Sequence, residues 1–509
     1  MADSIDQTCQ GVVTGSVGGG VGIWDRKAID RPAAAAGGPQ LRQALGRGTL
    51  TMIGIASIVG AGIFVLTGTA AAQYAGPGIV LSLVFAGTAC LCAALCYAEF
   101  ASMIPEAGGA YNYAYATLGE IVAWMVGWML VLEYLFSSSV IAIGWSGYFI
   151  SFLEGFGITI PAALTQPPLI AAGGELVASG AIVNLPAVLL VLALTGLLLC
   201  AIRESAIVSN FLVVLKIGVV VLVIAVGLFY VDPDRWTPLI PPNSGVPGEY
   251  GWSGVMRGAA IVFYAYLGFD IVASGAQEAR DPQRDLPFAI VASLLFCTVL
   301  YILMSLVMTG LVDYRALNVP HPIYVAIAGA GPALAWLKII VALGAIIGLA
   351  SCCLMGLYGQ TRVFYAMSRD GLLPPLFSWL HPQFRTPWMC VIAVGVVAAA
   401  LGGLLPIGVL GELISLGTLL AFSVVCAGIV VLRYREPARR RPFRTPFFPL
   451  IPVAGILSCA YLMISLPIST WARLAWWFAL GLVVYAMYGR THSHLRGPGP
   501  VAARVEAVD

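Results

Sequence analysis

The chain has 509 residues, of which 60% are hydrophobic and only 10% are charged, and its formal net charge is +2. Its mean hydropathy is +0.93. A soluble domain carries about 25% charged residues, so this composition excludes an ordinary soluble protein and predicts one that lies in a lipid bilayer. The small net charge gives no reason to expect a nucleic-acid partner.

Apolar runs of about 20 residues, the length that crosses a bilayer core, recur along nearly the whole chain. The linkers between them are too short for a soluble domain, so the expected fold class is an all-α membrane protein with about twelve transmembrane helices. The predicted spans are Thr49 to Ala72, Gly78 to Met103, Glu120 to Ile150, Leu185 to Ile202, Ser205 to Tyr230, Val255 to Gln277, Pro287 to Val312, Ala333 to Met367, Trp388 to Leu405, Gly408 to Arg433, Leu450 to Ile468 and Trp471 to Tyr488.

Both ends of the chain are predicted to lie in the cytoplasm. Cytoplasmic loops carry the excess of lysine and arginine, and most of the 26 basic residues fall there if the N-terminus and the even-numbered loops are cytoplasmic. Residues 1–44 are expected to be a disordered tail, residues 45–490 the transmembrane domain and residues 491–509 a second tail. No signal peptide or lipidation motif is recognised, and we expect a multi-pass protein of the inner (plasma) membrane.

One loop holds six arginines between Arg433 and Arg444. We attribute this cluster to topology and to attraction by anionic lipid headgroups rather than to nucleic-acid binding.

Cysteine and histidine usage argues against a metal, a cofactor or an enzyme. Ten of the 11 cysteines fall in predicted spans, where they are expected to pack as small apolar residues, and Cys9 lies in the tail. All four histidines lie in loops or in the C-terminal tail. No span therefore offers a histidine base, and no catalytic residue is assigned.

The first predicted span contains Gly60-Ala61-Gly62 between Ile58 and Ile63. Glycine lets backbone N–H groups approach a ligand closely, and the positive end of a restarted half-helix would stabilise a substrate carboxylate. Tight helix packing through small residues is the alternative.

Three ionisable residues, Glu133, Lys216 and Asp270, lie inside apolar spans. A charge at the bilayer centre costs about 3 kcal/mol or more, so such groups usually mark a functional site. Helices broken near the bilayer midplane are a common way for secondary transporters to hold a substrate. These features together predict a carrier.

The sixth predicted span is interrupted at Gly268-Phe269-Asp270, five spans after the first break, which is the placement expected of an inverted repeat of five plus five helices. Carbonyl groups freed at Tyr266 and Leu267 could hold a substrate ammonium group. Phe263 or Phe269 could gate the site. Capping of the restarted half-helix is an alternative role for Asp270.

At these positions the chain resembles the cationic amino acid transporter family of the amino acid, polyamine and organocation superfamily, in particular its bacterial twelve-span members. The matching motifs run in order over residues 45 to about 490. They are Gly60 to Gly68, Tyr97-Ala98-Glu99-Phe100 with Pro105 to Tyr111, Glu204-Ser205 with Lys216, Tyr266 to Asp270, Pro282 to Pro287, and Gln360-Thr361-Arg362 with Met367 to Pro374.

The resemblance implies two inverted five-helix repeats, about 45–230 and 255–433, with two extra helices at about 450–488. It also implies sodium-independent transport of L-amino acids and allows for a small accessory membrane subunit. The family more often has threonine or serine where Ala61 stands, so a hydroxyl that could touch the carboxylate is missing. Backbone donors at Ala61, Gly62 and Ile63 survive that difference.

Two charged residues match family positions. Lys216 matches a fifth-span lysine whose ammonium is similar in position to the sodium ion of sodium-coupled relatives. Its protonation could therefore couple transport to protons. The alternative is that Lys216 is a fixed structural cation. Glu133 matches a third-span glutamate that would pair with a cationic side chain; hydrogen bonding to the Ser137 to Ser139 face is the alternative.

The expected function is proton-coupled transport of L-amino acids, chiefly arginine, lysine and ornithine and also neutral ones such as alanine. The alternative is an amino acid or polyamine exchanger in which Lys216 is a fixed structural cation.

In the eighth span, Cys353 belongs to a run of small residues that leaves room for a long side chain. The predicted substrate site comprises Ile58, Gly60, Ala61, Gly62, Ile63, Glu133, Phe263, Tyr266, Leu267, Phe269, Asp270 and Cys353, with Lys216 for proton coupling.

Overall fold

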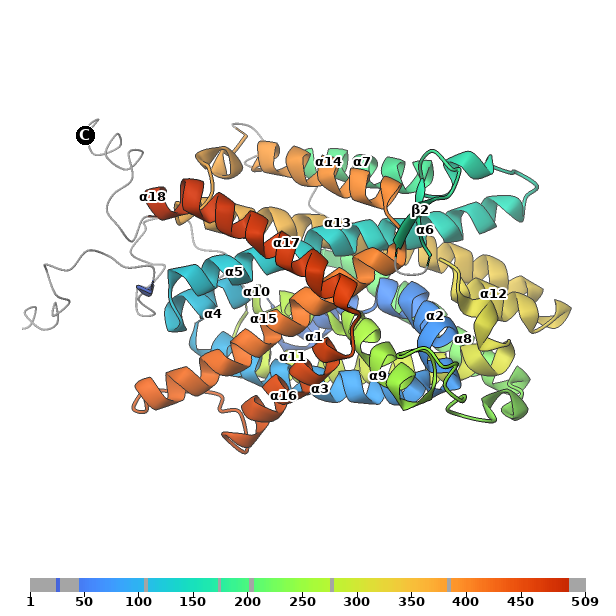
Figure 1. The fold of residues 1–509 in the computed structure, drawn as a ribbon, viewed down its shortest axis with the longest axis horizontal. Coiled ribbons are helices and arrows are strands. Elements are labelled where there is room, and N and C mark those ends of the chain that lie inside the picture. Colours follow the sequence, from blue (N-terminus) through green and yellow to red (C-terminus); the bar gives the residue numbers. More distant parts are fainter. Residues whose placement is uncertain are drawn as a thin grey trace, which may run out of the picture.

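A computed structural model describes residues 24–27, 45–104, 109–172, 175–200, 206–274, 279–381 and 386–493, and these are mostly helical. Figure 1 shows that the longer helices run side by side along the long axis of the molecule. Their residues are largely apolar with few helix breakers, as the predicted spans require. The predicted tails lie mainly outside the described residues.

The first part of the chain folds into helices that are interrupted by short π-helical and 3-10 turns. Such irregular turns inside a helix often accompany functional sites. The elements are α1 (Arg47–Ile58), a π turn (Gly62–Leu66), α2 (Thr67–Ala70), a second π turn (Ala71–Ala75), a 3-10 turn (Gly76–Gly78), α3 (Ile79–Met103), α4 (Ala110–Thr117), α5 (Glu120–Val131), a π turn (Leu132–Phe136), α6 (Ser137–Glu154), α7 (Leu185–Leu199) and α8 (Ala206–Gly227).

The second part repeats this mixture of long and broken helices. Short 3-10 turns also occur in its loops. The elements are α9 (Gly251–Val262), a 3-10 turn (Phe263–Tyr266), α10 (Ile271–Ser274), α11 (Pro282–Leu311), α12 (Pro322–Gly329), α13 (Ala335–Arg369), α14 (Trp388–Leu404), α15 (Ile407–Arg435), α16 (Leu450–Ile464), α17 (Ile468–Val484), a π turn (Tyr485–Gly489) and α18 (Arg490–His492).

A small β-hairpin, which the sequence reasoning did not predict, follows α6. Strands β1 (Leu169–Ala172) and β2 (Glu175–Ala178) pair antiparallel, with Leu169 opposite Ala178. The hairpin lies in the loop between α6 and α7.

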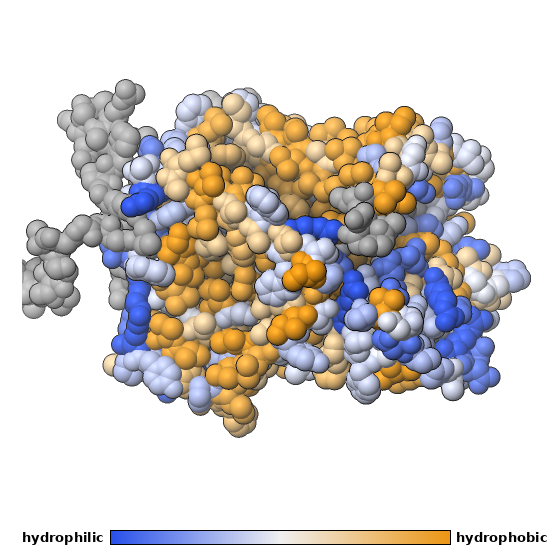
Figure 2. Space-filling model, viewed as in Figure 1, coloured by the Kyte–Doolittle hydropathy of each residue, from blue (hydrophilic) through white to orange (hydrophobic). Residues whose placement is uncertain are grey.

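The helices have the length and composition of membrane spans. Seven stretches of the described chain are long and apolar enough to cross a bilayer, and α7, α14 and α16 are apolar but shorter. Figure 2 shows hydrophobic residues over a broad area between hydrophilic residues at the two ends of the molecule. Large apolar side chains such as Val221, Val299 and Val396 are exposed on these helices, as expected where a protein faces lipid rather than water. The protein is a multi-pass membrane protein.

Glu99, near the end of α3, is fully buried, and two arginines neutralise its negative charge. The Arg433 guanidinium donates to its two carboxylate oxygens at 3.0 and 2.5 Å, and Arg441 lies 3.4 Å away. The backbone N–H of Thr445 also donates to this carboxylate. Glu99 therefore joins α3 to the end of α15 and to the loop that follows.

Glu412, in the second turn of α15, is buried and has partners on other helices. It accepts a hydrogen bond from Thr470 at 2.6 Å, and Arg257 and Arg473 lie 3.4 and 3.8 Å away. Because these partners lie on α9 and α17, the sequence of the span that holds Glu412 does not reveal them.

Part of the predicted N-terminal tail packs against the helical domain. The N–H of Lys27 donates to the Tyr115 carbonyl, and the N–H of Glu120 donates to the Asp25 carbonyl. Lys27 also forms an ion pair with Asp370 at 3.5 Å. Residues 24–27 are thus bound at the start of α5, while the rest of residues 1–44 lies outside the described chain.

Candidate functional site

The first break lies between α1 and the π turn that follows it. Val59 leaves the helical conformation with ψ at 89°, and helical hydrogen bonding resumes with the Phe64 N–H donating to the Gly60 carbonyl. Within the described residues, no backbone acceptor is found for the N–H groups of Ala61, Gly62 and Ile63. The restarted helix therefore presents free donors at its positive end.

The second break follows α9 and its 3-10 turn. Leu267 is extended with ψ at 147°, and Gly268 has φ at +110°, a region that residues with a side chain rarely adopt. The short helix α10 begins three residues later, so Gly268 supplies the sharp change of chain direction. Asp270 directly precedes α10.

The two breaks pack against each other through their glycines. A side chain at Gly62 would collide with the Cα of Ala265, and one at Gly268 would lie 2.7 Å from the carbonyl carbon of Ser57. Each break is thus fitted to the backbone of the other. Packing and ligand binding were both left open for Gly62 by the sequence, and its Cα is in close packing contact with the second break.

Tyr301 of α11 links both breaks through one buried hydroxyl. Its oxygen lies 2.7 Å from the Ile58 carbonyl and 2.9 Å from the Ala265 carbonyl, both acceptors. Each of these carbonyls belongs to a helix end that lacks a continuing helix to satisfy it. The hydroxyl has one proton, which these two carbonyls share, and it thereby links the two interrupted segments.

Glu133 and Asp270 form an acidic pair with Tyr134 between α5 and the second break. Tyr134 donates its hydroxyl to Asp270 Oδ2. Both carboxylate oxygens of Glu133 and the Oδ1 of Asp270 are buried without a hydrogen-bond partner. Among the described residues neither carboxylate forms an ion pair, and Glu133 also lacks a hydrogen-bond partner.

Lys216 of α8 reaches the first break from the opposite side. Its side chain is 2% exposed, and its ammonium donates to the Ala56 carbonyl in the last turn of α1. The Cys352 sulfur lies 3.3 Å from the ammonium and 3.2 Å from the Val59 carbonyl. A cation at the negative end of α1 is electrostatically favourable, so Lys216 and Cys352 stabilise the first break.

A cavity of about 50 Å³ lies between the two breaks and the acidic pair. Pockets that bind small molecules measure about 300 Å³ or more, so this space is too small for an amino acid. Six of the predicted site residues line it: Ile58, Gly60, Ala61, Gly62, Glu133 and Leu267.

Other predicted site residues lie near the cavity without lining it. Phe263 and Phe269 both pack their rings against Phe422 of α15, behind the second break. Tyr266 donates its hydroxyl to the Leu83 carbonyl, and the Cys353 thiol to the Ser138 carbonyl. Ile63 is fully buried in the π turn that follows the first break. Asp270 is joined to the cavity through Tyr134.

Several cavity residues were missed by sequence reasoning. Helical spacing from Glu133 could have found Ser137 and Ile141, which lie four and eight positions further on and so share its face. Tyr134, the next residue along the chain, does not share that face by spacing. The contribution of α13 has no such signal, because it depends on how that helix packs. The missed lining residues are Ser57, Tyr134, Ser137, Ile141, Tyr264, Gly268, Ile271, Cys352, Met355 and Gly356.

Comparison with known proteins agrees with this architecture. A family model described as amino acid permease matches residues 45–487. A branched-chain amino acid permease of Bacillus subtilis (strain 168) is 44% identical over 475 residues, 93% of this chain and 99% of the relative. A methylthioribose transporter of the same organism is 43% identical over 474 residues, with the same coverage. A vacuolar cationic amino acid transporter 4 of Arabidopsis thaliana is 40% identical over 398 residues, 78% of this chain and 64% of the relative. The chain belongs to the amino acid permease family of the amino acid, polyamine and organocation superfamily and is a transporter rather than an enzyme.

Proposed function

We propose that the protein is a sodium-independent, proton-coupled transporter of L-amino acids with a cationic side chain, such as arginine, lysine and ornithine. In this proposal twelve spans form two inverted five-helix repeats plus two helices, in the inner membrane with both termini cytoplasmic. Broken helices in corresponding positions of two repeats are the arrangement from which such carriers bind substrate.

The two breaks supply groups that match the invariant part of an amino acid. A substrate carboxylate would accept hydrogen bonds from the free N–H groups of Ala61, Gly62 and Ile63. Its ammonium group would donate to backbone carbonyls at Tyr266 and Leu267. These contacts involve no side chain of the substrate, so they explain recognition of amino acids as a class and leave selectivity to the rest of the cavity.

The observation that carries the cationic selectivity is the buried Glu133 carboxylate, which has no partner in the described chain. Glu133 lines the cavity, and neither of its carboxylate oxygens has a partner. A buried carboxylate is unfavourable unless a proton or a cation neutralises it. A substrate guanidinium or ammonium would provide that charge and form hydrogen bonds stronger than those between neutral groups.

Lys216 is the proposed proton-coupling residue. Within the described chain its hydrogen-bond acceptors are a carbonyl and a thiol, so no acidic side chain there fixes its charge. Loss of its proton would remove the attraction to the end of α1 and loosen the first break. Protonation and the geometry of the substrate site are thereby linked.

The small cavity requires movement for transport. Since about 50 Å³ cannot hold an amino acid, the helices around the two breaks must separate when substrate binds. Alternating access through motion of one helix group against the other meets this requirement.

A neutral substrate is the second candidate. The branched-chain permease and the methylthioribose transporter are named for uncharged substrates, and both are more similar to this chain than the vacuolar cationic transporter. A protonated Glu133 would suit such a substrate. An exchanger in which Lys216 is a fixed cation is the alternative to proton coupling.

Uptake into proteoliposomes in sodium-free buffer tests the proposal. Radiolabelled arginine, leucine and alanine are compared with and without an inward proton gradient. We expect arginine to be preferred and the gradient to stimulate its uptake, and Lys216→Ala to remove that stimulation. Preference for leucine would establish the neutral alternative, and uptake that needs internal amino acid and ignores the gradient would establish the exchanger.

A further inference from the structure

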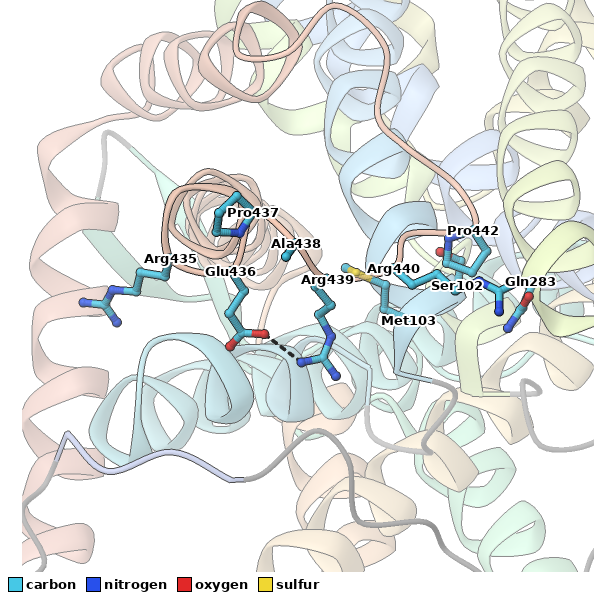
Figure 3. Close-up of a pocket in the computed structure, with 10 residues that line it drawn as sticks. All are labelled: Ser102, Met103, Gln283, Arg435, Glu436, Pro437, Ala438, Arg439, Arg440 and Pro442. Carbon is cyan, nitrogen blue, oxygen red and sulfur yellow. Dashed lines mark hydrogen bonds and ion pairs between the residues drawn. The ribbon is translucent and has the colours of Figure 1, made fainter. Parts of the chain in front are cut away.

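A second cavity, of about 630 Å³, lies open at the end of the helical domain, away from the substrate site. Figure 3 shows that its polar side chains do not converge on one point. Arg435 points away from Arg440 and Gln283, and the ion pair of Glu436 with Arg439 lies between them. We therefore assign no ligand to this cavity.

Tyr97 of α3 and Tyr113 of α4 each hold a hydroxyl inside the protein without a hydrogen bond. Their side chains are buried, and neither hydroxyl has a partner within the described chain. The hydroxyls of Tyr134, Tyr266 and Tyr301, by contrast, all donate to defined acceptors. Leaving a buried hydroxyl unpaired is unfavourable, so the two idle hydroxyls require a physical explanation.

Tyr97 lies directly against the second break. Its ring packs edge-on against Phe269, with 5.3 Å between the ring centroids, and Phe269 immediately precedes Asp270. The ring of Tyr113 lies one step further away and packs against Tyr97 and Phe100, at 5.9 and 4.9 Å between centroids. The charge of Asp270 reaches both hydroxyls. Of the two residues, Tyr97 is the one placed to follow the break when it moves.

Asp270 has one donor that is bound and one that is idle. Tyr134, in the π turn after α5, donates its hydroxyl to Asp270 Oδ2. Tyr97, on α3, has a free hydroxyl within reach of the same charge in the described chain. An ionised carboxylate offers about four acceptor sites, so Asp270 can exchange one tyrosine for the other without changing its own protonation.

Opening of the cavity must move Tyr134 away from the second break. Tyr134 and Gly268 line the cavity of about 50 Å³ from the α5 side and from the break, and these two walls have to part before an amino acid fits. The break is held on its other side, where Phe269 packs against Tyr97 and Phe422. We therefore expect the break to stay with α3 while the α5 side moves away.

We propose that Tyr97 is a positioning residue that takes Asp270 over from Tyr134 when the cavity opens. This role rests on the alternating access of the proposed function. In the open state the Tyr97 hydroxyl donates to the Asp270 carboxylate and replaces the hydrogen bond that is lost on the α5 side. Exchange of one donor for another keeps the closed and open states close in free energy, so substrate binding can shift the balance between them. The hydroxyl that is idle in the closed state is the one that the open state needs.

The native Cys352 thiol reports how often the cavity opens, because it lines the cavity and is only 6% exposed in the closed state. The test measures the rate at which N-ethylmaleimide alkylates Cys352 in the purified full-length protein, with tandem mass spectrometry to separate it from the neighbouring Cys353. The variants are Tyr97→Phe and Tyr134→Phe. Tyr113→Phe is the matched control, because it also removes a buried hydroxyl that has no partner in the described chain but leaves the contacts of the second break intact.

Loss of a hydrogen bond to a charged group changes an equilibrium by about tenfold or more. We expect Tyr97→Phe, which removes a donor from the open state, to slow alkylation of Cys352 about tenfold. Tyr134→Phe removes a donor from the closed state and should speed alkylation about tenfold. Tyr113→Phe should change the rate less than about twofold. Equal rates in Tyr97→Phe and the wild type would overturn the proposal, and so would equal slowing in Tyr97→Phe and Tyr113→Phe.

Thermal unfolding of the same variants guards against a folding defect. Because the Tyr97 hydroxyl has no partner in the described chain of the closed state, Tyr97→Phe should unfold at the wild-type temperature or above it. Tyr134→Phe should unfold at a lower temperature. A fall in Tyr97→Phe as large as that in Tyr134→Phe would overturn the proposal, since it would reveal a bond in the closed state. Alkylation needs no substrate and no proton gradient, so failure of arginine preference or of proton coupling leaves this test intact.

Discussion

Glu99 and Glu133 are both buried carboxylates, yet their surroundings are opposite. Glu99 is bound by Arg433, Arg441 and the N–H of Thr445 at a helix end. Glu133 has no partner for either oxygen and lines the cavity between the broken helices. A buried carboxylate that is paired with arginines of the same protein holds helices together. A buried carboxylate without a partner is available to a ligand.

The largest expected effect concerns the compensated carboxylate. Glu99→Ala leaves the buried Arg441 and the partly buried Arg433 without a counter-charge, so we expect a loss of about 3–5 kcal/mol in unfolding free energy. Thermal unfolding of the purified protein measures it. Glu436→Ala, which breaks a partly exposed pair, is the control and should cost about 1 kcal/mol or less. Equal losses in the two variants would remove the structural role of Glu99.

The packing of the two breaks can be tested at Gly268. Alanine there must adopt φ near +110° and place a side chain 2.7 Å from Ser57. We expect a loss of about 2–4 kcal/mol and no detectable uptake. Gly196→Ala in α7 is the control, since a side chain there meets nothing within 4 Å. Retained uptake in Gly268→Ala would show that the breaks need not interlock.

The contrast with Glu99 is sharpest for Glu133→Gln. Because this substitution removes a buried charge without breaking an ion pair, we expect the unfolding free energy to stay the same or rise by up to about 2 kcal/mol. Unfolding temperature in the absence of substrate is the measurement. A fall as large as that of Glu99→Ala would mean that Glu133 is a structural residue.

A smaller effect is expected from the hydroxyl that joins the breaks. Tyr301→Phe should lose about 1 kcal/mol of stability and slow uptake about tenfold, because the Ile58 and Ala265 carbonyls lose their donor. Tyr485→Phe loses a comparable buried hydrogen bond, to Glu120, far from the breaks. Stability and uptake are measured for both. If the two variants transport equally, Tyr301 only supports folding.

The smallest effect on transport is expected at His321, which precedes α12. Burial lowers its pKa to about 4, so the imidazole is neutral at physiological pH. His321→Gln should therefore leave the pH profile of uptake between 5.5 and 7.5 unchanged, within about 20%. The unfolded chain takes up its proton more readily, so wild-type stability should fall from pH 6.5 toward 4 more steeply than that of the variant. A shifted uptake profile would make His321 part of proton coupling.

Sequence reasoning found what lies within single helices. Apolar length predicted a helical membrane protein, and the glycines at positions 60, 62 and 268 predicted both breaks, because a local irregularity leaves a local signal. Relations between helices were not accessible in the same way. Packing between distant segments determines the Tyr301 contact and the partners of Glu412. It also determines that Cys352 lines the cavity, where the sequence predicted Cys353.

The central claim is that Glu133 recognises a cationic side chain. Arginine and citrulline have nearly the same size and shape and differ in charge, so the ratio of their affinities for the purified protein isolates the electrostatic contribution. We expect the wild-type protein to prefer arginine by about 30-fold or more, as for a hydrogen bond between charged groups, and Glu133→Gln to bring the ratio close to one. A ratio near one in the wild type, or a preference for arginine that Glu133→Gln does not change, would contradict the claim.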